Sequence, residues 1–217
     1  MWWAIAGVLA LGAGLAGPVM SNVEQPPYRV IEQQDDIELR DYPPMIVAET
    51  QVAGSRQAAI NAGFRTIADY IFGNNESAQK VAMTAPVLQQ AGEKIAMTAP
   101  VTQQGTGDSW RVRFIMPASY TLASLPRPKN PAVVLRELPG RRFAAIRFSG
   151  LAGEDSLRRH TESLRAFLAG RQIHAVGEPS YAFYNPPWTL PFMRRNEVLI
   201  EVGNSAALPA GATPPGP

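Results

Sequence analysis

Alternation of apolar and polar residues predicts three strands at the start of the folded part of the chain. The alternation covers residues 28–31, 37–40 and 45–52, and Asp and Pro residues separate the three stretches. A period of two residues is typical of half-buried strands, and Asp and Pro are common in the turns between them. We therefore expect the domain to open with a hairpin.

The pattern then changes to a helical period. Ser55 can cap a helix that runs to Phe72, and Gly73 with Asn74 can end it. Four apolar residues recur at intervals of four, three and four positions, which places them on one face of that helix. They are Ile60, Phe64, Ile67 and Ile71. A helix with one apolar stripe is expected to pack on a sheet.

The same order of elements returns about 96–100 residues later. Residues 39–43 are similar to residues 135–139, and the predicted strand 110–116 is similar to residues 197–202. A second amphipathic helix is predicted at 154–169. A repeat this long, present in two copies, indicates an internally duplicated domain rather than an open array. We predict an α+β fold with halves at about 28–117 and 131–202, each a hairpin, a helix and two strands. The expected product is a distorted antiparallel β-barrel or curved sheet flanked by two helices.

A shorter repeat lies inside the first half. Residues 80–87 read KVAMTAPV and residues 94–101 read KIAMTAPV. The 14-residue period predicts two strands of a hairpin. Pro86 and Pro100 lack an amide donor, so they are expected at strand ends or sheet edges.

The two ends of the chain differ from its middle. Residues 1–23 contain no charged side chain, and residues 2–20 are almost entirely apolar, which predicts a signal peptide or a membrane anchor. The protein is thus expected to be exported or attached to a membrane, in the periplasm if it is bacterial; cleavage and retention are both left open. Residues 204–217, rich in Ala, Pro and Gly, are expected to form a disordered tail after a domain at 24–203.

Composition narrows the chemistry. With 217 residues, 46% of them hydrophobic, the chain can bury the core of one ordinary domain. The net charge of +2 comes from scattered Lys and Arg residues, so nucleic acid is not an expected partner. The absence of cysteine excludes disulfides, a thiolate nucleophile and Cys-ligated metal sites. Motifs of serine hydrolases, P-loop proteins and zinc proteases are also missing, so we do not expect an enzyme.

Three longer motifs carry a resemblance to a known family. The tandem KVAMTAPV and KIAMTAPV, the opening IELRDYPPMIVAE and the closing YAFYNPPWTLPFMRRNEVLIEV occur in order between residues 28 and 202. Together they resemble the SOUL/heme-binding-protein family. The resemblance implies a duplicated α+β barrel and reversible, non-covalent binding of heme or a related tetrapyrrole, for buffering, transport or delivery. It implies no established catalytic residues. The alternative is an enzyme or regulatory module that acts on another hydrophobic small molecule through the same groove.

Heme is an apolar plate with two propionates, so its site needs an apolar slot, cations and, optionally, an axial ligand. The candidates for the slot are Ile60, Phe64, Ile67, Ile71, Met83, Met97 and Trp188. Arg194 and Arg195 are candidates for the propionates, and His160 is the candidate axial ligand. Each has a plain alternative: core packing for the apolar set, a salt bridge for the arginines, and a helix-edge position for the histidine. No structural metal is expected.

Overall fold

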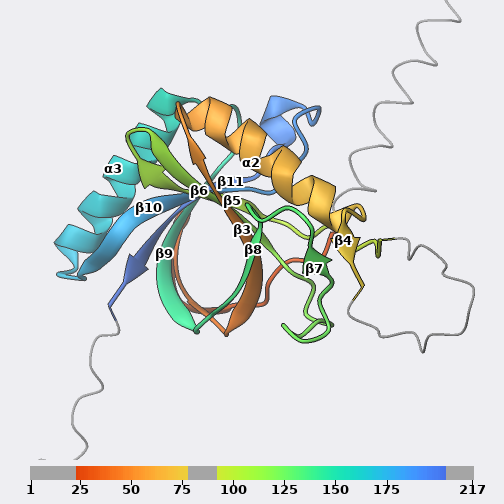
Figure 1. Cartoon of the computed structure of the whole chain (residues 1–217). Coiled ribbons are helices and arrows are strands. Elements are labelled where there is room, and N and C mark those ends of the chain that lie inside the picture. The colour runs from red at the N-terminus through yellow and green to blue at the C-terminus, as the bar shows by residue number, and fades with distance from the viewer. Residues whose placement is uncertain (1–22, 78–91, 204–217) are drawn as a thin grey trace, which may run out of the picture.

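The computed structural model describes residues 23–77 and 92–203. Two helices lie on one side of a strongly bent antiparallel sheet of nine strands (Figure 1), which confirms the α+β class. In chain order the elements are β1 (Arg29–Gln34), β2 (Ile37–Tyr42), β3 (Met45–Ala53), α2 (Arg56–Ile71), β4 (Asn75–Glu76), β5 (Val101–Thr106), β6 (Ser109–Ile115), β7 (Arg127–Pro128), β8 (Val134–Leu138), β9 (Arg141–Phe148), α3 (Glu154–Gly170), β10 (Ala175–Phe183), the 3₁₀ turn η2 (Pro191–Met193) and β11 (Asn196–Val202).

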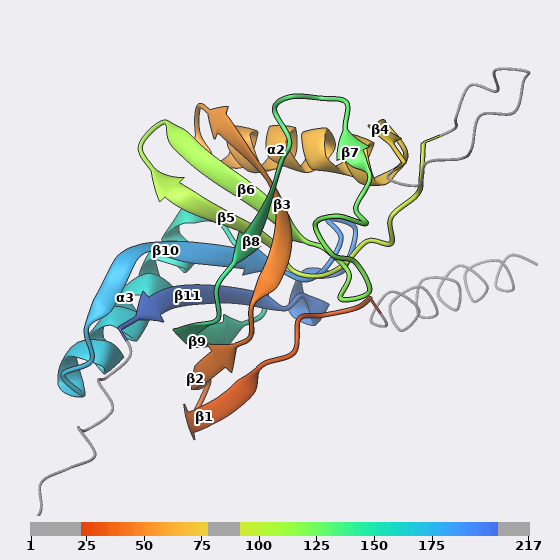
Figure 2. The same cartoon turned by 60° about the horizontal axis from the view of Figure 1, so that its bottom comes forward.

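The large sheet is open. Its strand order is β1-β2-β9-β11-β10-β5-β6-β3-β8, and β4 and β7 form a separate two-stranded sheet. The two outermost strands, β1 and β8, do not pair with each other, so the sheet is not closed into a barrel; of the two predicted forms, the distorted barrel is wrong and the curved sheet is correct. Figure 2 shows β1 and β2 at one end of this curved sheet.

Only part of the predicted hairpin pattern holds. β1 and β2 form the opening hairpin, whereas β2 and β3, joined by Pro43 and Pro44, do not pair with each other. Two consecutive prolines have fixed φ near −65° and cannot adopt the positive φ of a two-residue hairpin turn. The chain therefore leaves β2, which pairs with β9, and enters β3 at the far side of the sheet, where it pairs with β6 and β8.

The strand order is symmetric. Without β1, the order is β2-β9-β11-β10-β5-β6-β3-β8. Each strand of the first half lies as far from one end as its counterpart in the second half lies from the other: β2 matches β8, β3 matches β9, β6 matches β11, and β5 and β10 pair at the centre. The two predicted halves thus occupy equivalent places in one sheet. That they arose by duplication stays a prediction.

The helices form two cores on the outer face of the sheet. α2 packs on β3 and β6, and α3 packs on β9, β10 and β11. Ser55 caps α2, its hydroxyl accepting a hydrogen bond from the amide of Ala58 at 3.4 Å. Gly63 allows α2 to approach the sheet closely, because a Cβ at that position would lie 2.5 Å from Cγ2 of Val112. Both predicted helices are confirmed to within a residue or two at each end.

The segment before β5 is not the strand that the short repeat predicts. Residues 92–100 form no strand; instead, the Ile95 amide donates to the carbonyl of Ile71 at 2.8 Å. The Asn75 side chain donates to the Glu93 carbonyl at 2.8 Å and accepts from the Glu93 amide at 2.9 Å. These contacts satisfy the backbone that a strand would have paired. Pro100 directly precedes β5, as expected, and the first copy at 80–87 lies outside the described residues.

The predicted terminal segments cannot be compared with this structure. Residues 1–22 and the tail at 204–217 lie outside the described residues. Within 23–77 and 92–203, no helix is both long and apolar enough to cross a membrane.

Candidate functional site

Two hollows adjoin each other. The inner hollow lies on the inner face of the sheet, which we define as the face opposite the helices, and the outer hollow lies at the sheet end, where Ile46, Met116 and Tyr120 of the α2 side also line it. Strand alternation separates the two faces: Val112 and Phe114 of β6 belong to the core under α2, whereas Arg113 and Ile115 point the other way. The outer hollow has a volume of about 360 Å³ and the inner hollow about 100 Å³. The larger volume lies within the range of roughly 300–1,000 Å³ typical of small-molecule sites.

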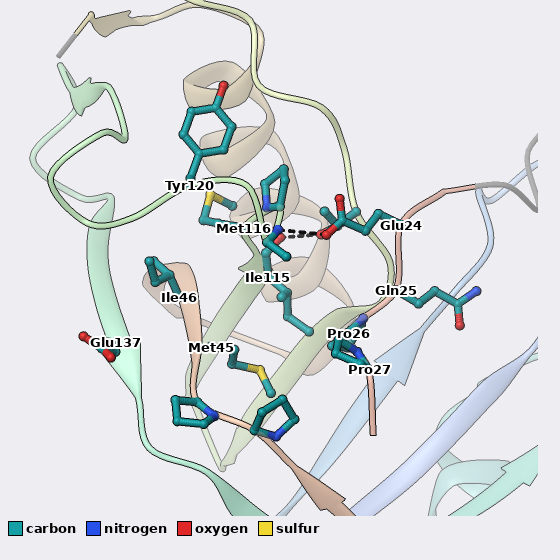
Figure 3. Close-up of a pocket in the computed structure, with 15 residues that line it drawn as sticks. Glu24, Gln25, Pro26, Pro27, Met45, Ile46, Ile115, Met116, Tyr120 and Glu137 are labelled. Carbon is teal, nitrogen blue, oxygen red and sulfur yellow. Dashed lines mark hydrogen bonds between the residues drawn. The ribbon is translucent and has the colours of Figure 1, made fainter. Parts of the chain in front are cut away.

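The outer hollow lies where the first described residues cross the ends of β3 and β6 (Figure 3). Met45 and Ile115 line it and also line the inner hollow, so the two hollows share a wall. Its rim is partly polar: the Glu24 carboxylate accepts from the amide of Ala118 at 2.8 Å. Glu137 is a second carboxylate in its lining.

The inner hollow is mainly apolar and carries two guanidinium groups. Its apolar lining includes Tyr42, Met45, Val47, Ile115, Phe143 and Leu199. Tyr42 and Phe143 meet edge to face, with ring centroids 5.7 Å apart. Arg113 and Arg141 are its cations, and Arg141 also forms an ion pair of 2.6 Å with Glu201. An apolar chamber with cations beside it suits an amphipathic anion.

Arg113 belongs to a cluster in which three arginines share one carboxylate. Glu49 is 5% exposed and accepts from Nε of Arg113 at 2.9 Å and from Nε of Arg136 at 2.5 Å, while Nε of Arg111 lies 3.8 Å away. Burial alone would raise the pKa of Glu49, but the bonds from Arg113 and Arg136 outweigh it and hold the pKa below its ordinary value. The cluster therefore keeps an excess of two positive charges on the inner face.

A second buried ion cluster lies beside the inner hollow, which its Tyr184 lines. Glu197 is fully buried and accepts from both Nη atoms of Arg40, at 2.7 and 3.1 Å, and from Nη2 of Arg195 at 2.7 Å. The hydroxyl of Tyr184 donates to the same carboxylate at 2.8 Å. Burial would raise the pKa of Glu197, yet the bonds and charge of Arg40, with Arg195, lower it. Burial raises the pKa of Tyr42 to about 12, so this phenol stays protonated.

The predicted apolar wall on α2 lies on the opposite side of the sheet from the inner hollow, and none of its residues lines either hollow. Ile67 and Ile71 are buried in the core beneath α2, and Ile60 and Met97 pack against that core. Phe64 is 36% exposed, with its ring 5.2 Å from that of Phe114. The structure brings these residues together as core packing, and Met83 lies outside the described residues.

The remaining candidates are dispersed, and each polar one has a partner in the fold. Arg194 donates to the carbonyl oxygens of the loop before it, and Arg195 is bound to Glu197. The ring of His160 stacks on Phe148 with centroids 3.9 Å apart. Trp188 is 72% exposed in a loop outside both hollows.

Sequence reasoning missed the inner face, although β6 carried a signal. Arg111 and Arg113 alternate there with Trp110, Val112 and Phe114, which indicates one charged and one apolar face. The carboxylate that binds Arg113 is set by the pairing of β3 with β6, which places Glu49 directly opposite Arg113. Within 23–77 and 92–203, no group of His, Asp and Glu side chains could hold a metal ion.

Comparison with known proteins gives the family and independent support for the fold. The model of the SOUL heme-binding protein family matches residues 23–201. Among solved structures, the C-terminal domain of EcmrR has a TM-score of 0.53 at 11% identity, covering 81% of this chain and 98% of that one. A hydrolase from Listeria innocua has a TM-score of 0.52 at 12% identity, covering 80% and 94%. An uncharacterized conserved protein from the same organism has a TM-score of 0.51 at 14% identity, covering 77% and 92%.

Identities this low show a shared fold and nothing about function. A search of curated proteins by sequence found no match. The family match is of a different kind, because it spans nearly the whole described domain, including both halves and both hollows. This chain belongs to the SOUL heme-binding protein family.

Proposed function

We propose that the protein binds heme or a related tetrapyrrole reversibly and serves in its buffering, transport or delivery. The family match over residues 23–201 is the observation that carries this proposal. The uncharged segment 1–23 supports a further proposal, that the protein works outside the cytoplasm or attached to a membrane.

The two hollows are the proposed place of binding. Met45, Ile115 and Phe143 offer an apolar surface for a porphyrin ring, and Arg113 and Arg141 offer donors for its carboxylates. A guanidinium carries five N–H donors, and the contacts of Arg113 with Glu49 and Gln104 engage only two of them. Paired N–H groups of this kind recognise carboxylates by two parallel hydrogen bonds.

The residue set fits the apolar plate and its acidic groups better than it fits axial ligation. Neither hollow is lined by a histidine, and Tyr42 is held as a neutral phenol. Apolar contact and charge would therefore provide most of the affinity, so the iron-free porphyrin should bind about as well as hemin. When bound, heme would supply its iron; the residues of this chain bind and orient the macrocycle.

A smaller hydrophobic anion is the second candidate ligand. The outer hollow, at about 360 Å³, lies near the lower end of the usual size range, so it would enclose a compact molecule more completely than a porphyrin. An enzyme or regulatory module that acts on such a molecule would use the same hollows.

A titration of the full chain in detergent with hemin, protoporphyrin IX and its dimethyl ester tests the proposal. Arg141→Met should weaken binding of the two free acids by about tenfold or more, since a charged hydrogen bond contributes roughly 1.5–3 kcal/mol. It should leave the uncharged ester unaffected. Arg142→Met is the matched control, because this neighbour in β9 pairs with Asp41 rather than lining either hollow.

Two further variants locate the site. Met45→Trp narrows both hollows at their shared wall and should reduce binding of all three porphyrins, whereas Phe64→Asp, on α2, should not. The reverse result would move the site to the helix. If the folded chain binds no porphyrin saturably, the tetrapyrrole assignment fails.

A further inference from the structure

The loop between β10 and β11 exposes an unusual number of large apolar side chains. Those in the loop are Trp188, 72% exposed, Leu190, 52%, Phe192, 73%, and Met193, 50%. Leu151, 63% exposed, follows Gly150, whose amide donates to the carbonyl of Pro191 in the same loop at 2.9 Å. These five side chains form what we call the apolar loop patch. Large apolar side chains exposed together in this way are typical of an interaction site.

The patch is displayed by an ordered framework. Arg194 donates from Nε to the carbonyl of Thr189 at 2.7 Å and from Nη2 to that of Pro187 at 2.5 Å. The amide of Thr189 donates to Pro186 at 3.0 Å, and the Arg195 amide donates to the side chain of Asn185 at 2.6 Å. Several backbone groups of the loop are thus hydrogen-bonded within it, while its large apolar side chains are exposed.

The patch lies near the first described residues of the chain. Arg195, which follows the loop, donates to the Gln25 side chain at 3.1 Å, so the end of the loop lies next to the first described residues. Figure 2 shows the loop around η2 and the start of the described chain at the same side of the molecule. The 22 residues that precede Val23 contain no charged side chain. A few extended residues span at most about 3.5 Å each, so a bilayer that holds this segment would lie within reach of the loop.

We propose that the apolar loop patch is a membrane-contact surface, which rests in the interfacial layer of a phospholipid bilayer beside the point where the uncharged N-terminal segment enters it. Trp and Phe side chains favour that layer, and apolar side chains buried there stabilise the attachment. The proposal rests on the membrane attachment proposed above for residues 1–23 and is independent of tetrapyrrole binding. It also orients the domain, because the end of the sheet that bears the loop faces the lipid.

The lack of cysteine makes a site-specific test straightforward. Leu190→Cys, labelled with an environment-sensitive fluorophore, is compared with Val176→Cys in the full chain reconstituted into phosphatidylcholine–phosphatidylglycerol vesicles. Val176 is a matched control, since it is 45% exposed and lies near the opposite end of β10 from the loop. The label at 190 should shift to the blue and be quenched by a nitroxide carried on the lipid, while the label at 176 should show neither effect.

A second comparison separates insertion from mere nearness to the tether. Trp188→Ser with Phe192→Ser should reduce quenching of the 190 label several-fold without lowering the unfolding midpoint, because both side chains are largely exposed. Equal quenching at 190 and 176 overturns the proposal. So does a blue shift at 190 that depends on protein concentration and is insensitive to the lipid nitroxide, because a second copy of the chain would then cover the patch.

Discussion

The buried ion cluster around Glu197 gives the sharpest stability prediction. Glu197 is fully buried and Arg40 is 1% exposed, so Glu197→Gln leaves the Arg40 charge in the interior without its main partner. Breaking a buried pair in this way costs about 3–5 kcal/mol. Arg40 keeps a 2.6 Å contact with Glu38, whose side chain is 21% exposed, so we expect a loss of about 3 kcal/mol, at the lower end of that range. For a domain of this size, that corresponds to a fall in Tm of roughly 6–12 °C.

Urea unfolding followed by circular dichroism measures the loss of stability. The slope of the free energy of unfolding against urea concentration should be the same in the variant and the wild type. Glu201→Gln, on the same strand, breaks a partly exposed pair with Arg141 and should cost about 1 kcal/mol or less. Replacing the pair together, with Arg40→Met and Glu197→Leu, should recover part of the loss, because the fully buried Arg40 charge is removed with its partner, whereas Arg195, whose side chain is 19% exposed, still loses its carboxylate. If Glu197→Gln costs less than 1 kcal/mol, the reasoning about the buried charge is wrong.

Two other predictions concern the pH dependence of stability and the packing of α2 on the sheet. The pKa of Glu197 lies below its ordinary value of 4.5 in the folded protein, so its contribution is complete above about pH 4.5 and is lost as the pH falls through the folded pKa. Urea midpoints measured between pH 3 and 7 should thus fall less steeply on the acid side in Glu197→Gln than in the wild type; parallel curves would contradict this. Gly63→Ala should cost about 1–3 kcal/mol, since its Cβ would lie 2.5 Å from Val112. Gly170→Ala, which meets open space, is the control, and equal thermal midpoints for the two variants would refute the packing argument.

The helices could be predicted from the sequence because local signals and core contacts agree there. Ser55 provides the cap, and the buried residues Ile67 and Ile71 recur on one face of α2. The pairing of β2 with β9 and of β3 with β8 could not be predicted in the same way. It depends on partners about a hundred residues distant, and only the Pro43–Pro44 junction gave a local indication that the intervening turn is not a hairpin.

The candidate site was harder to predict, for a related reason. An apolar stripe indicates burial but does not distinguish a core from a ligand wall, and the α2 stripe belongs to a core. The inner face becomes visible only when register places Glu49 opposite Arg113 and brings Arg136 to the same carboxylate. The family resemblance indicated the class of ligand without indicating which face of the sheet receives it.

Strands of the first half pair with strands of the second half, and this affects how the chain folds. β2 and β3 are made early, yet their partners β9 and β8 come about 90 to 110 residues later, as in the pairs Met45–Leu138 and Ile37–Ile146. Such non-local pairing raises contact order and slows folding. During synthesis, the edges of β2 and β3 stay unpaired until β8 and β9 have been made. These unpaired edges can pair with those of another nascent copy of the chain. The outer strands thus make completion of the sheet a late event that depends on the C-terminal half.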